Sequence, residues 1–234
     1  MKPCAVLTGA SSGIGEAIGN MLCEENYEVY GFGRDFSDCR VESPNFFHRI
    51  KGDLLDTPWL LEQVKRIQKD QKISLLINNA GVGYYGLHEE LNTKKIQEMV
   101  RTNLEVPMIL TQLLLRRLKQ EKGTIINISS VTAQKENPHG CAYGATKAGL
   151  FSFSRSLFEE ARKYGVKVVD LQPDMTKTKL YRNADFGEGK EEASYLLPED
   201  VAEAVRFILQ QKDRLAVTHM TLRPQLHRIQ KKKE

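Results

Sequence analysis

The segment CAVLTGASSGIG, residues 4–15, contains a short apolar run that leads directly into a glycine-rich turn. The run at 4–8 predicts a buried strand, and the apolar residues that follow across 13–25 have helical spacing. Gly9, Gly13 and Gly15 lie at the junction, where glycine lets the backbone come close to a pyrophosphate. The N-terminus of the following helix presents free N–H groups and the positive end of its dipole. A glycine-rich turn alone is a weak signal, but its place between a strand and a helix predicts a phosphate-binding turn.

The same alternation of strand and helix continues along the rest of the chain. Further strands are predicted at 28–32, 46–51, 73–78, 123–130, 166–173 and 216–222. Further helices are predicted at 57–68, where Thr57 is the expected N-cap, and at 93–119, 141–165 and 198–210. Pro107 lies inside the predicted helix at 93–119 and should kink or locally adjust it.

Strands that alternate with helices predict an α/β fold, here a parallel sheet with helices on both faces. No repeat or linker divides the chain, so residues 1–234 are interpreted as a single doubly wound Rossmann-type domain. The segment at about 174–197 has no clear period and contains Gly187 and Gly189, which makes it a candidate mobile lid. The basic segment at about 228–234 is interpreted as a solvated tail, with a nucleic-acid or lipid patch as the alternative.

Composition excludes several classes of protein. With 34 basic and 30 acidic residues in 234, the net charge of +4 is small, and no nucleic-acid partner is expected. No stretch approaches the 18 or so apolar residues of a membrane span, and the N-terminal apolar run is too short for a signal peptide. A cytoplasmic protein without a membrane partner is therefore expected. The four cysteines lack C-x-x-C spacing and the five histidines lack H-x-x-x-H spacing, so reduced thiols and no metal site are expected.

The spacing T-G-x-x-x-G-x-G at residues 8–15 differs from the commoner G-x-G-x-x-G. With this spacing the sequence resembles the short-chain dehydrogenase/reductase family, in its branch of about 250 residues. The resemblance continues in order along residues 3–178. Its motifs are Asp53 in GDLLD, the N-N-A-G sequence at 78–81, Asn103, Ser130, and the Y-x-x-x-K pair of Tyr143 and Lys147.

Tyr143 and Lys147 are four residues apart and therefore share one face of a helix. Alone, such a pair is usually an amphipathic surface pair. A free tyrosine has a pKa near 10, and a neighbouring ammonium would lower it, helped by the positive charge of an oxidised nicotinamide. The resemblance implies that Tyr143 is the general acid/base, that Ser130 hydrogen-bonds the substrate oxygen, and that Lys147 also holds the nicotinamide ribose.

Asn103 is implied to anchor a water that leads from Lys147 to solvent. Ser129 lies next to Ser130, but successive residues of a strand point to opposite faces, so only one of the two can serve. The alternatives are a strand-end cap for Ser130 and a hydrogen bond at the helix kink for Asn103.

The cofactor is expected to be NADP, with NAD as the alternative. An NAD site places an acid at the end of the second strand, where this chain has Gly33 followed by Arg34, which can fork onto a 2′-phosphate. Asp35 could become the ribose acid after a one-residue shift. The complete set of expected cofactor-binding residues is Gly9, Ser11, Ser12, Gly13, Ile14, Gly15, Arg34, Asp53, Leu54, Asn79, Ala80, Gly81, Tyr143, Lys147, Thr176 and Thr178.

Two departures from the family concern the substrate side. Asp174 replaces the glycine of P-G-x-x-x-T, which predicts either backbone strain or a different loop path. The ending THMTLRPQLHRIQKKKE lacks the paired glycines of fatty-acid-type 3-oxoacyl reductases and looks more like that of serine-type dehydrogenases. A 3-hydroxy acid or a 3-oxoacyl-type compound is the expected substrate. The candidate substrate residues are Tyr84, Tyr85, Gln134, His139 and Tyr181. His139 could contact a substrate carboxylate, although a histidine in such a loop is more often simply exposed.

The resemblance implies an enzyme that interconverts a carbonyl and a secondary alcohol on a small molecule. One alternative is a catalytically silent NADP-sensing regulator, although such proteins typically lose the tyrosine or lysine that this chain keeps. A second alternative is a sugar-nucleotide epimerase or dehydratase, which would need a larger C-terminal domain. A homodimer or homotetramer is implied, with apolar residues available on more than one face of the helices at 93–119 and 142–164.

Overall fold

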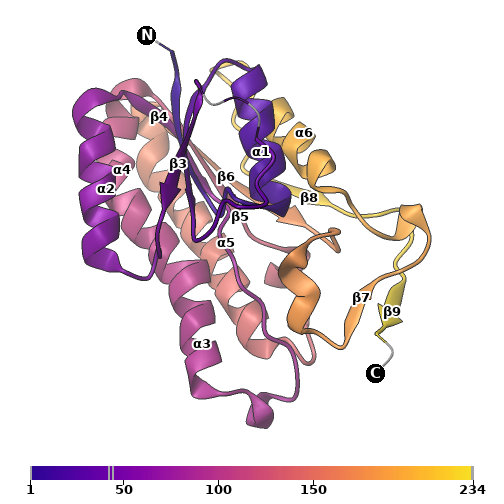
Figure 1. Cartoon of the computed structure of the whole chain (residues 1–234). Helices are drawn as coiled ribbons and strands as arrows, with labels where there is room; N and C mark the ends of the chain where they lie inside the picture. The colour runs from indigo at the N-terminus through magenta and orange to yellow at the C-terminus, as the bar shows by residue number, and fades with distance from the viewer. Residues whose placement is uncertain (1, 42, 44, 233–234) are drawn as a thin grey trace.

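The computed structural model describes residues 2–41, 43 and 45–232, and its elements follow the predicted alternation (Figure 1). The strands are β1 (Cys4–Thr8), β2 (Glu28–Gly33), β3 (Phe47–Lys51), β4 (Ile73–Asn78), β5 (Thr124–Ile128), β6 (Lys167–Pro173), β7 (Phe186–Glu188), β8 (His219–Leu222) and β9 (Ile229–Lys231). The helices are α1 (Gly13–Glu24), α2 (Thr57–Asp70), α3 (Thr93–Val100), α4 (Val106–Glu121), α5 (Cys141–Ala161) and α6 (Pro198–Leu209).

Seven of the strands form one parallel sheet with the order β3-β2-β1-β4-β5-β6-β8. The chain moves outward from β1 in one direction and then returns to add β4 on the other side. The carboxyl ends of β1 and β4 therefore border the topological switch point, which is where doubly wound sheets bind ligands. The predicted doubly wound Rossmann-type fold is confirmed.

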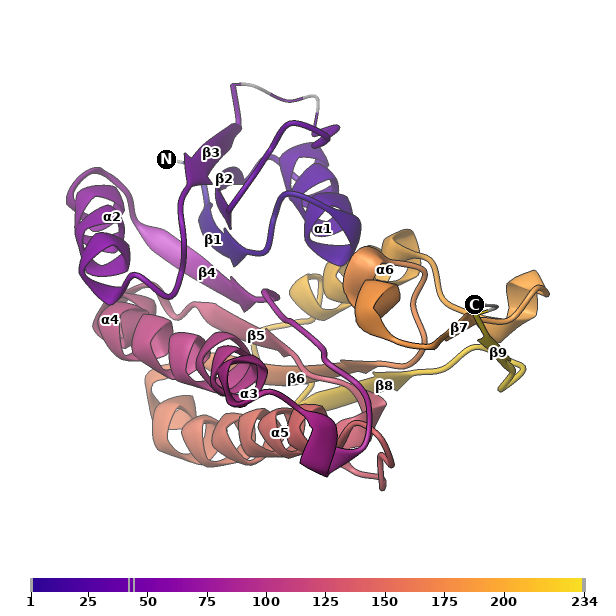
Figure 2. The same ribbon diagram turned by 60° about the horizontal axis from the view of Figure 1, so that its bottom comes forward.

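Helices cover both faces of this sheet, as Figure 2 shows. On one face α1 and α6 pack together, and their apolar residues join Ala5 and Leu7 of β1 in one core. On the other face α2, α4 and α5 pack over Cys4 and Val6. Consecutive residues of β1 thus enter opposite cores, which is why this strand is apolar at every position except its last.

The predicted helix at 93–119 divides around a single π-helical turn, Arg101–Glu105, between α3 and α4. Pro107 has no N–H, and its ring would clash with the carbonyl of Asn103 in a regular α-helix. A π turn just before the proline relieves that clash, and such turns often occur at functional sites. The predicted local adjustment is present, four residues before the proline, and it contains Asn103.

One boundary differs from the prediction. The N-cap of α2 is Asp56, whose carboxylate accepts a hydrogen bond of 3.1 Å from the N–H of Trp59, whereas Thr57 was expected. Aspartate and threonine are both good caps, and Asp56 lies one residue earlier, so that Pro58 falls within the first turn.

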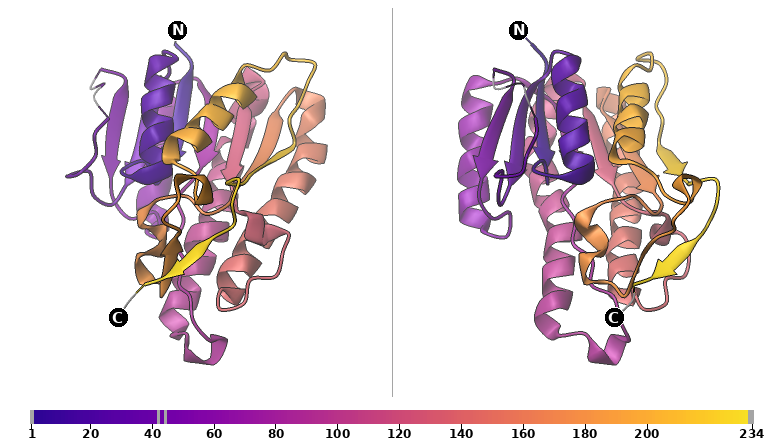
Figure 3. Two further views of the ribbon diagram at one scale, coloured as in Figure 1. Left: turned by 90° about the vertical axis from the view of Figure 1, so that its right-hand side faces the viewer. Right: turned by 45° about the vertical axis from the view of Figure 1, so that its right-hand side comes forward.

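The lid segment and the basic tail pair with each other, which the sequence did not predict. β7 in the lid and β9 in the tail form a two-stranded antiparallel sheet, in which Gly187 lies opposite Gln230. Figure 3 shows this ribbon projecting beyond the carboxyl ends of the main sheet. The described part of the basic tail is therefore a solvent-exposed strand; residues 233–234 lie outside the described residues. None of the helices in the described part of the chain is long and apolar enough to cross a membrane.

Candidate active site

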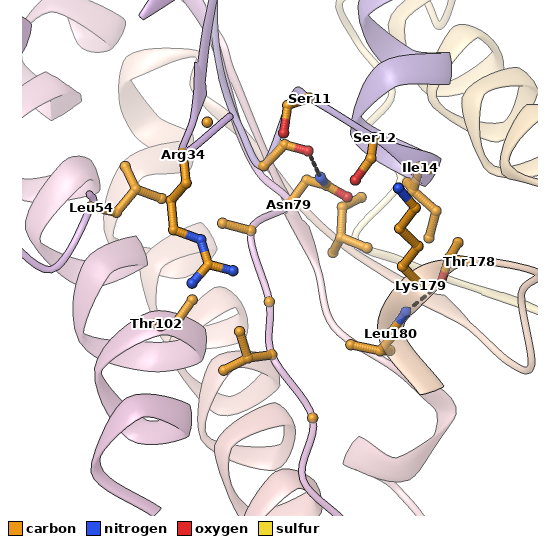
Figure 4. Close-up of a pocket in the computed structure, with 18 of the residues that line it drawn as sticks. Ser11, Ser12, Ile14, Arg34, Leu54, Asn79, Thr102, Thr178, Lys179 and Leu180 are labelled. Atoms are coloured by element: carbon orange, nitrogen blue, oxygen red, sulfur yellow. Dashed lines mark hydrogen bonds between the residues drawn. The ribbon is translucent and has the colours of Figure 1, made fainter. Parts of the chain in front are cut away.

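A cleft of about 350 Å³ opens at the carboxyl ends of β1, β4, β5 and β6, between the glycine-rich turn and the lid (Figure 4). Most residues that the sequence assigned to a cofactor line it. They are Gly9, Ser11, Ser12, Gly13, Ile14, Arg34, Asp53, Leu54, Asn79, Ala80, Gly81, Tyr143, Lys147, Thr176 and Thr178. Gly15 is the exception, because it lies behind the turn.

The glycines of the turn are required by contacts within the protein. A Cβ on Gly15 would lie 2.0 Å from the carbonyl oxygen of Gly9, where no atom can fit. Gly9 has a φ of +65° and its Cβ would lie 2.8 Å from the Cα of Ala80. The turn is thus pressed against the first turn of α1 on one side and the end of β4 on the other.

Hydrogen bonds join the ends of β1 and β4 beneath the turn. The Thr8 hydroxyl accepts from the N–H groups of Asn79 and Ala80, both at 3.0 Å. The side-chain amide of Asn79 donates to the carbonyls of Thr8 and Gly9 at 3.0 and 3.2 Å. These bonds give the N-N-A-G motif a structural task, which is to fix the turn against the neighbouring strand.

The start of α1 is open toward the cleft. Its N-cap residue Ser12 has extended backbone and makes no side-chain capping hydrogen bond. Ser11, Ser12, Gly13 and Ile14 line the cleft at this point (Figure 4). The first N–H groups of a helix have no intrahelical partner, so this end can receive an anion.

Arg34 extends from the end of β2 into the cleft toward Thr102 (Figure 4). Its side chain is 63% exposed, and its guanidinium lies 3.8 Å from the Glu98 carboxylate, a weak pair that leaves most donors free. The Asp35 carboxylate is already engaged by the N–H and hydroxyl of Ser37, at 3.2 and 3.0 Å. The bond from the Ser37 hydroxyl is also the main reason why the pKa of Asp35 is lowered.

Tyr143, Lys147 and Ser130 meet on the floor of the cleft. Tyr143 and Lys147 project from α5, and both side chains are buried. Ser130 is the second residue after β5 and hydrogen-bonds Tyr143. The Lys147 ammonium donates to the Ile128 carbonyl at the last position of β5, at 2.9 Å. One helix and one strand end thus bring together a phenol, a hydroxyl and an amine.

The protonation of Tyr143 differs from the expectation. Burial raises the pKa of Tyr143 to about 12, and the hydrogen bond with Ser130 opposes this rise. Burial also lowers the pKa of Lys147 to about 8, while the charge of Asp170 acts in the opposite direction. Burial thus outweighs, in this arrangement, the lowering expected from the Lys147 ammonium, which lies 5.7 Å from the centroid of the Tyr143 ring.

The two serines at the end of β5 have different partners. The Ser129 hydroxyl donates to the buried Asp170 carboxylate at 2.6 Å, whereas Ser130 hydrogen-bonds Tyr143. Asn103 is also fully engaged. Its side chain accepts from the N–H and donates to the carbonyl of Val82, both at 2.9 Å, and donates to Thr146 at 3.1 Å. The Asn103 side chain therefore fixes the loop after β4 and does not line the cleft.

The five predicted substrate residues separate into two groups. Tyr181 lines the cleft, and Tyr85 packs beside it, with ring centroids 5.9 Å from Tyr181 and 5.7 Å from Tyr143. Phe186 of β7 completes this aromatic cluster at 5.1 Å from Tyr85. Burial raises the pKa values of Tyr85 and Tyr181, so both phenols stay neutral.

The other three lie outside the cleft lining. The Tyr84 hydroxyl donates to Glu98 at 2.8 Å, and the Gln134 amide donates to Gln172 at 2.6 Å. His139 is exposed, in a left-handed turn with a φ of 62°, and its carbonyl accepts from the N–H of Gly86. The suggestion that His139 contacts a substrate carboxylate is not supported by this position.

Asp174 does not carry the strain that its replacement of glycine suggested. Its φ is not positive, its N–H donates to the Leu222 carbonyl at 2.9 Å, and its carboxylate accepts from the N–H of Met175. The loop follows a path that an ordinary residue can adopt. It leads to Lys179 and Arg182, two cations that line the cleft and were not predicted from the sequence. Their position just after Thr178, a predicted cofactor contact, could have identified them.

Comparison with known proteins agrees with this geometry. The family model described as short chain dehydrogenase matches residues 3–188. An uncharacterized oxidoreductase of Staphylococcus epidermidis is 30% identical over 225 residues, covering 94% of this chain and 96% of that protein. A 3-oxoacyl-[acyl-carrier-protein] reductase of Buchnera aphidicola is 30% identical over 90% of this chain and 91% of its own length. The structure of an alcohol dehydrogenase from Thermococcus sibiricus, complexed with 5-hydroxy-NADP, superimposes with a TM-score of 0.86 at 26% identity, covering 97% of both chains. The chain therefore belongs to the short-chain dehydrogenase family and is an NAD(P)-dependent oxidoreductase.

Proposed function

We propose that the protein is an NADP-dependent oxidoreductase that interconverts a carbonyl and a secondary alcohol, with Tyr143 as general acid/base. The observation that carries this proposal is the convergence of Tyr143, Ser130 and Lys147 on the floor of the cleft that the glycine-rich turn borders. A proton donor, a hydroxyl hydrogen-bonded to it and a buried amine are the groups that carbonyl reduction needs.

The cleft residues fit a dinucleotide. The open start of α1 suits the pyrophosphate, because Ser12 leaves it uncapped and a Cβ on Gly13 would lie 3.2 Å from the Thr178 methyl and narrow the cradle. Lys179 lines the same end of the cleft in Figure 4 and would add a cation to this cradle. Asp53 and Leu54 suit the adenine side, and Gly81, Lys147 and Thr178 the nicotinamide side. When bound, the nicotinamide supplies or accepts the hydride.

The preference for NADP rests on the residues after β2. Arg34 can place its guanidinium fork on a 2′-phosphate, whereas the Asp35 carboxylate is held by Ser37 and lies 3.9 Å from the Lys51 ammonium. The archaeal alcohol dehydrogenase complexed with 5-hydroxy-NADP, at 26% identity, supports the same preference.

The chemistry of the chain's own residues follows from their protonation. Ser130 hydrogen-bonds the substrate oxygen and polarises the carbonyl, and Tyr143 gives its phenolic proton to that oxygen as the negative charge develops. A phenol whose pKa is raised to about 12 holds its proton at neutral pH, which is the protonation state that carbonyl reduction needs. In alcohol oxidation the phenolate takes the proton instead, and the Lys147 ammonium stabilises that phenolate.

The substrate is proposed to be a small 3-oxoacyl-type compound or a 3-hydroxy acid. The 30% identical reductase of Buchnera aphidicola supports the 3-oxoacyl class. The aromatic cluster of Tyr85, Tyr181 and Phe186 beside Tyr143 offers apolar walls to the carbon chain on one side of the carbonyl.

We also propose that the chain forms a homodimer or homotetramer through α4 and α5. Leu113, Leu115, Phe151 and Phe158 on these helices are only half-buried, which is typical of a face that a partner covers. Light scattering coupled to gel filtration would give the mass of the particle, and a monomer at micromolar concentration would contradict this proposal.

The proposed activity is tested by following NADPH or NADH at 340 nm against acetoacetate, acetoacetyl-coenzyme A, ethyl acetoacetate and acetophenone. We expect turnover of at least one compound with NADPH, and a loss of at least about a thousandfold in kcat for Tyr143→Phe, because proton transfer and positioning are both lost.

Tyr164→Phe is the matched control, since Tyr164 is exposed and lies outside the cleft lining. Turnover that survives in Tyr143→Phe would contradict the acid–base assignment. NADPH binding without turnover of any wider carbonyl panel would favour the regulator.

A further inference from the structure

Beneath the cleft lies a buried carboxylate that the proposed reaction does not use. Asp170 in the middle of β6 is 0% exposed. Its Oδ1 accepts hydrogen bonds from the Ser129 hydroxyl at 2.6 Å and the Gln172 amide at 2.9 Å, and its Oδ2 lies 3.5 Å from the Ser154 hydroxyl. Donors that converge on a carboxylate stabilise its ionised form, and a buried charge is retained where it is bonded or paired.

Asp170 belongs to a chain of buried side-chain hydrogen bonds that crosses the sheet. On one side Asn78 donates to Asn127 and Asn127 donates to Ser154, both at 2.8 Å. On the other side Gln172, which donates to Asp170, accepts from Gln134 and from Thr221, at 2.6 and 2.9 Å. The network therefore joins β4, β5, α5, β6 and β8 behind the catalytic floor, with Asp170 as its ionisable member.

This network reaches the reacting groups at three consecutive residues. The Ile128 carbonyl accepts from the Lys147 ammonium, the Ser129 hydroxyl donates to Asp170, and Ser130 hydrogen-bonds Tyr143. The end of β5 is thus held between the amine of α5 and the carboxylate of β6. A displacement of Ser129 would displace both the Lys147 acceptor and Ser130, since they are its chain neighbours.

We propose that Asp170 is a positioning residue, the buried counter-charge that keeps Lys147 protonated and, through Ser129, holds the end of β5 on which Ser130 lies. The inference rests on the roles given to Lys147 and Ser130 in the proposed function. A buried ammonium without a counter-charge is unstable and loses its proton. With its proton, Lys147 can bind ribose hydroxyls and stabilise a phenolate; neutral Lys147 does neither as well.

The electrostatics agree in direction. Burial lowers the pKa of Lys147 to about 8, and the Asp170 charge raises it toward its ordinary value. The pKa of Asp170 is raised overall by burial, and the Ser129 bond, the Gln172 bond and the Lys147 charge oppose that rise. Two other titratable groups come from the elements around Lys147 and Asp170, namely Tyr143 from α5 and His219 from β8. Ser129 after β5 and Gln172 of β6 are uncharged. His219 is the register partner of Asp170, and its exposed ring packs on Phe151. Removal of the Asp170 charge should therefore lower the pKa of Lys147 further.

The test measures the protonation of Lys147 directly. Protein labelled with ¹³C at the lysine Cε is titrated by NMR, and the Lys147 signal is assigned by its loss in Lys147→Arg. We expect a wild-type midpoint above pH 7, and a midpoint lower by about one unit or more in Asp170→Asn, which keeps the side chain's shape but removes its charge. Ser154→Ala is the matched control, because it removes a hydroxyl from the same network without changing its charge.

A second arm separates position from charge. In Ser129→Ala the carboxylate remains, so the Lys147 midpoint should shift by clearly less than in Asp170→Asn. NADPH-dependent reduction of the best panel substrate should nevertheless fall about tenfold in kcat, since the end of β5 loses its anchor. In Asp170→Asn the alkaline limb of the pH–rate profile should move to lower pH together with the NMR midpoint.

Three results would overturn the proposal. They are an unchanged midpoint in Asp170→Asn, an equal shift in Ser154→Ala, or a wild-type midpoint below pH 7, and the last can be read whether or not any variant folds. The NMR arm needs no substrate. If the proposed reaction is wrong, the NMR titration still decides the role of Asp170. If the positioning role is wrong, turnover that depends on Tyr143 is still observed.

Discussion

The two walls of the cleft are built by different means. The cofactor wall, residues 9–15 with the ends of β1 and β4, is fixed by backbone contacts between neighbouring strands and by the four hydrogen bonds of Thr8 and Asn79. The lid wall, residues 174–197, is held from outside by a tail segment more than thirty residues further along the chain. The first wall is closely packed, whereas the outer part of the second wall, around β7, depends on exposed bonds to the tail.

The difference in exposure follows from this construction. The strand β9 is exposed at all of its positions, and Ile229 is 52% exposed. Its pairing with β7 is supplemented by an ion pair between Arg228 and Glu191 and by a bond from the Lys232 N–H to the Asp185 carbonyl at 2.8 Å. Segments with few buried apolar contacts and solvent-exposed backbone bonds open most easily. We therefore expect the lid wall to open without disturbing the cofactor wall.

The largest expected difference between the walls is seen when one methyl group is added to each wall in turn. Gly15→Ala should destabilise the protein by about 2–3 kcal/mol and abolish NADPH binding, because the new Cβ would meet the Gly9 carbonyl at 2.0 Å. Gly187→Ala in β7 should stay within about 0.5 kcal/mol of the wild type, since its Cβ would have only the end of Lys232 at 3.7 Å. Urea unfolding and NADPH fluorescence titration give both quantities. Equal effects of the two substitutions would contradict the difference between the walls.

The sequence predicted the cofactor wall well because its signals are local. The spacing of Gly9, Gly13 and Gly15 alone indicates a tight turn. The four-residue spacing of Tyr143 and Lys147 alone indicates that they share one face of a helix. Each of these inferences needed no more than a few neighbouring residues. Pro107 likewise signalled an irregular helix, although only the structure shows that a π turn around Asn103 absorbs it.

The features that the sequence did not predict depend on contacts between distant segments. Phe186 joins Tyr85 and Tyr181 only because β7 is held by β9, and no local pattern identifies that pairing. Asp170 lies in an apolar strand, so its importance becomes visible only through Ser129 and Lys147. The raised pKa of Tyr143 has the same origin, because burial is a property of the whole fold.

A smaller effect is expected from Arg34, an exposed predicted cofactor contact that lies after β2, beside the cofactor wall. Arg34→Gln should weaken NADPH binding about 10- to 100-fold, the loss of one charge-assisted bond of about 1.5–3 kcal/mol. NADH binding should change less than twofold, because Arg34 would touch only the 2′-phosphate. The dissociation constants of NADPH and NADH are measured for the wild type and for Arg34→Gln. Arg66→Gln, on the exposed face of α2, is the matched control. A parallel loss of NADH affinity would mean that Arg34 supports the wall itself and does not select the cofactor.

The smallest expected effect tests the lid wall directly. Removal of residues 228–234 deletes β9 and the Arg228–Glu191 pair, so the lid loses its outer support. Because these bonds are exposed, their loss should amount to about 1 kcal/mol, which raises KM for the carbonyl substrate about fivefold. The dissociation constant of NADPH should stay within about twofold, because the Thr8 and Asn79 bonds are untouched and the cofactor contacts Thr178 and Lys179 precede the segment that pairs with β9. Lys231→Gln, which keeps the strand and changes only its charge, separates the pairing from electrostatic attraction to the substrate. A truncated protein that loses NADPH affinity as strongly as substrate affinity would show that the two walls act as one unit, because a lid that opened alone would leave the cofactor in place.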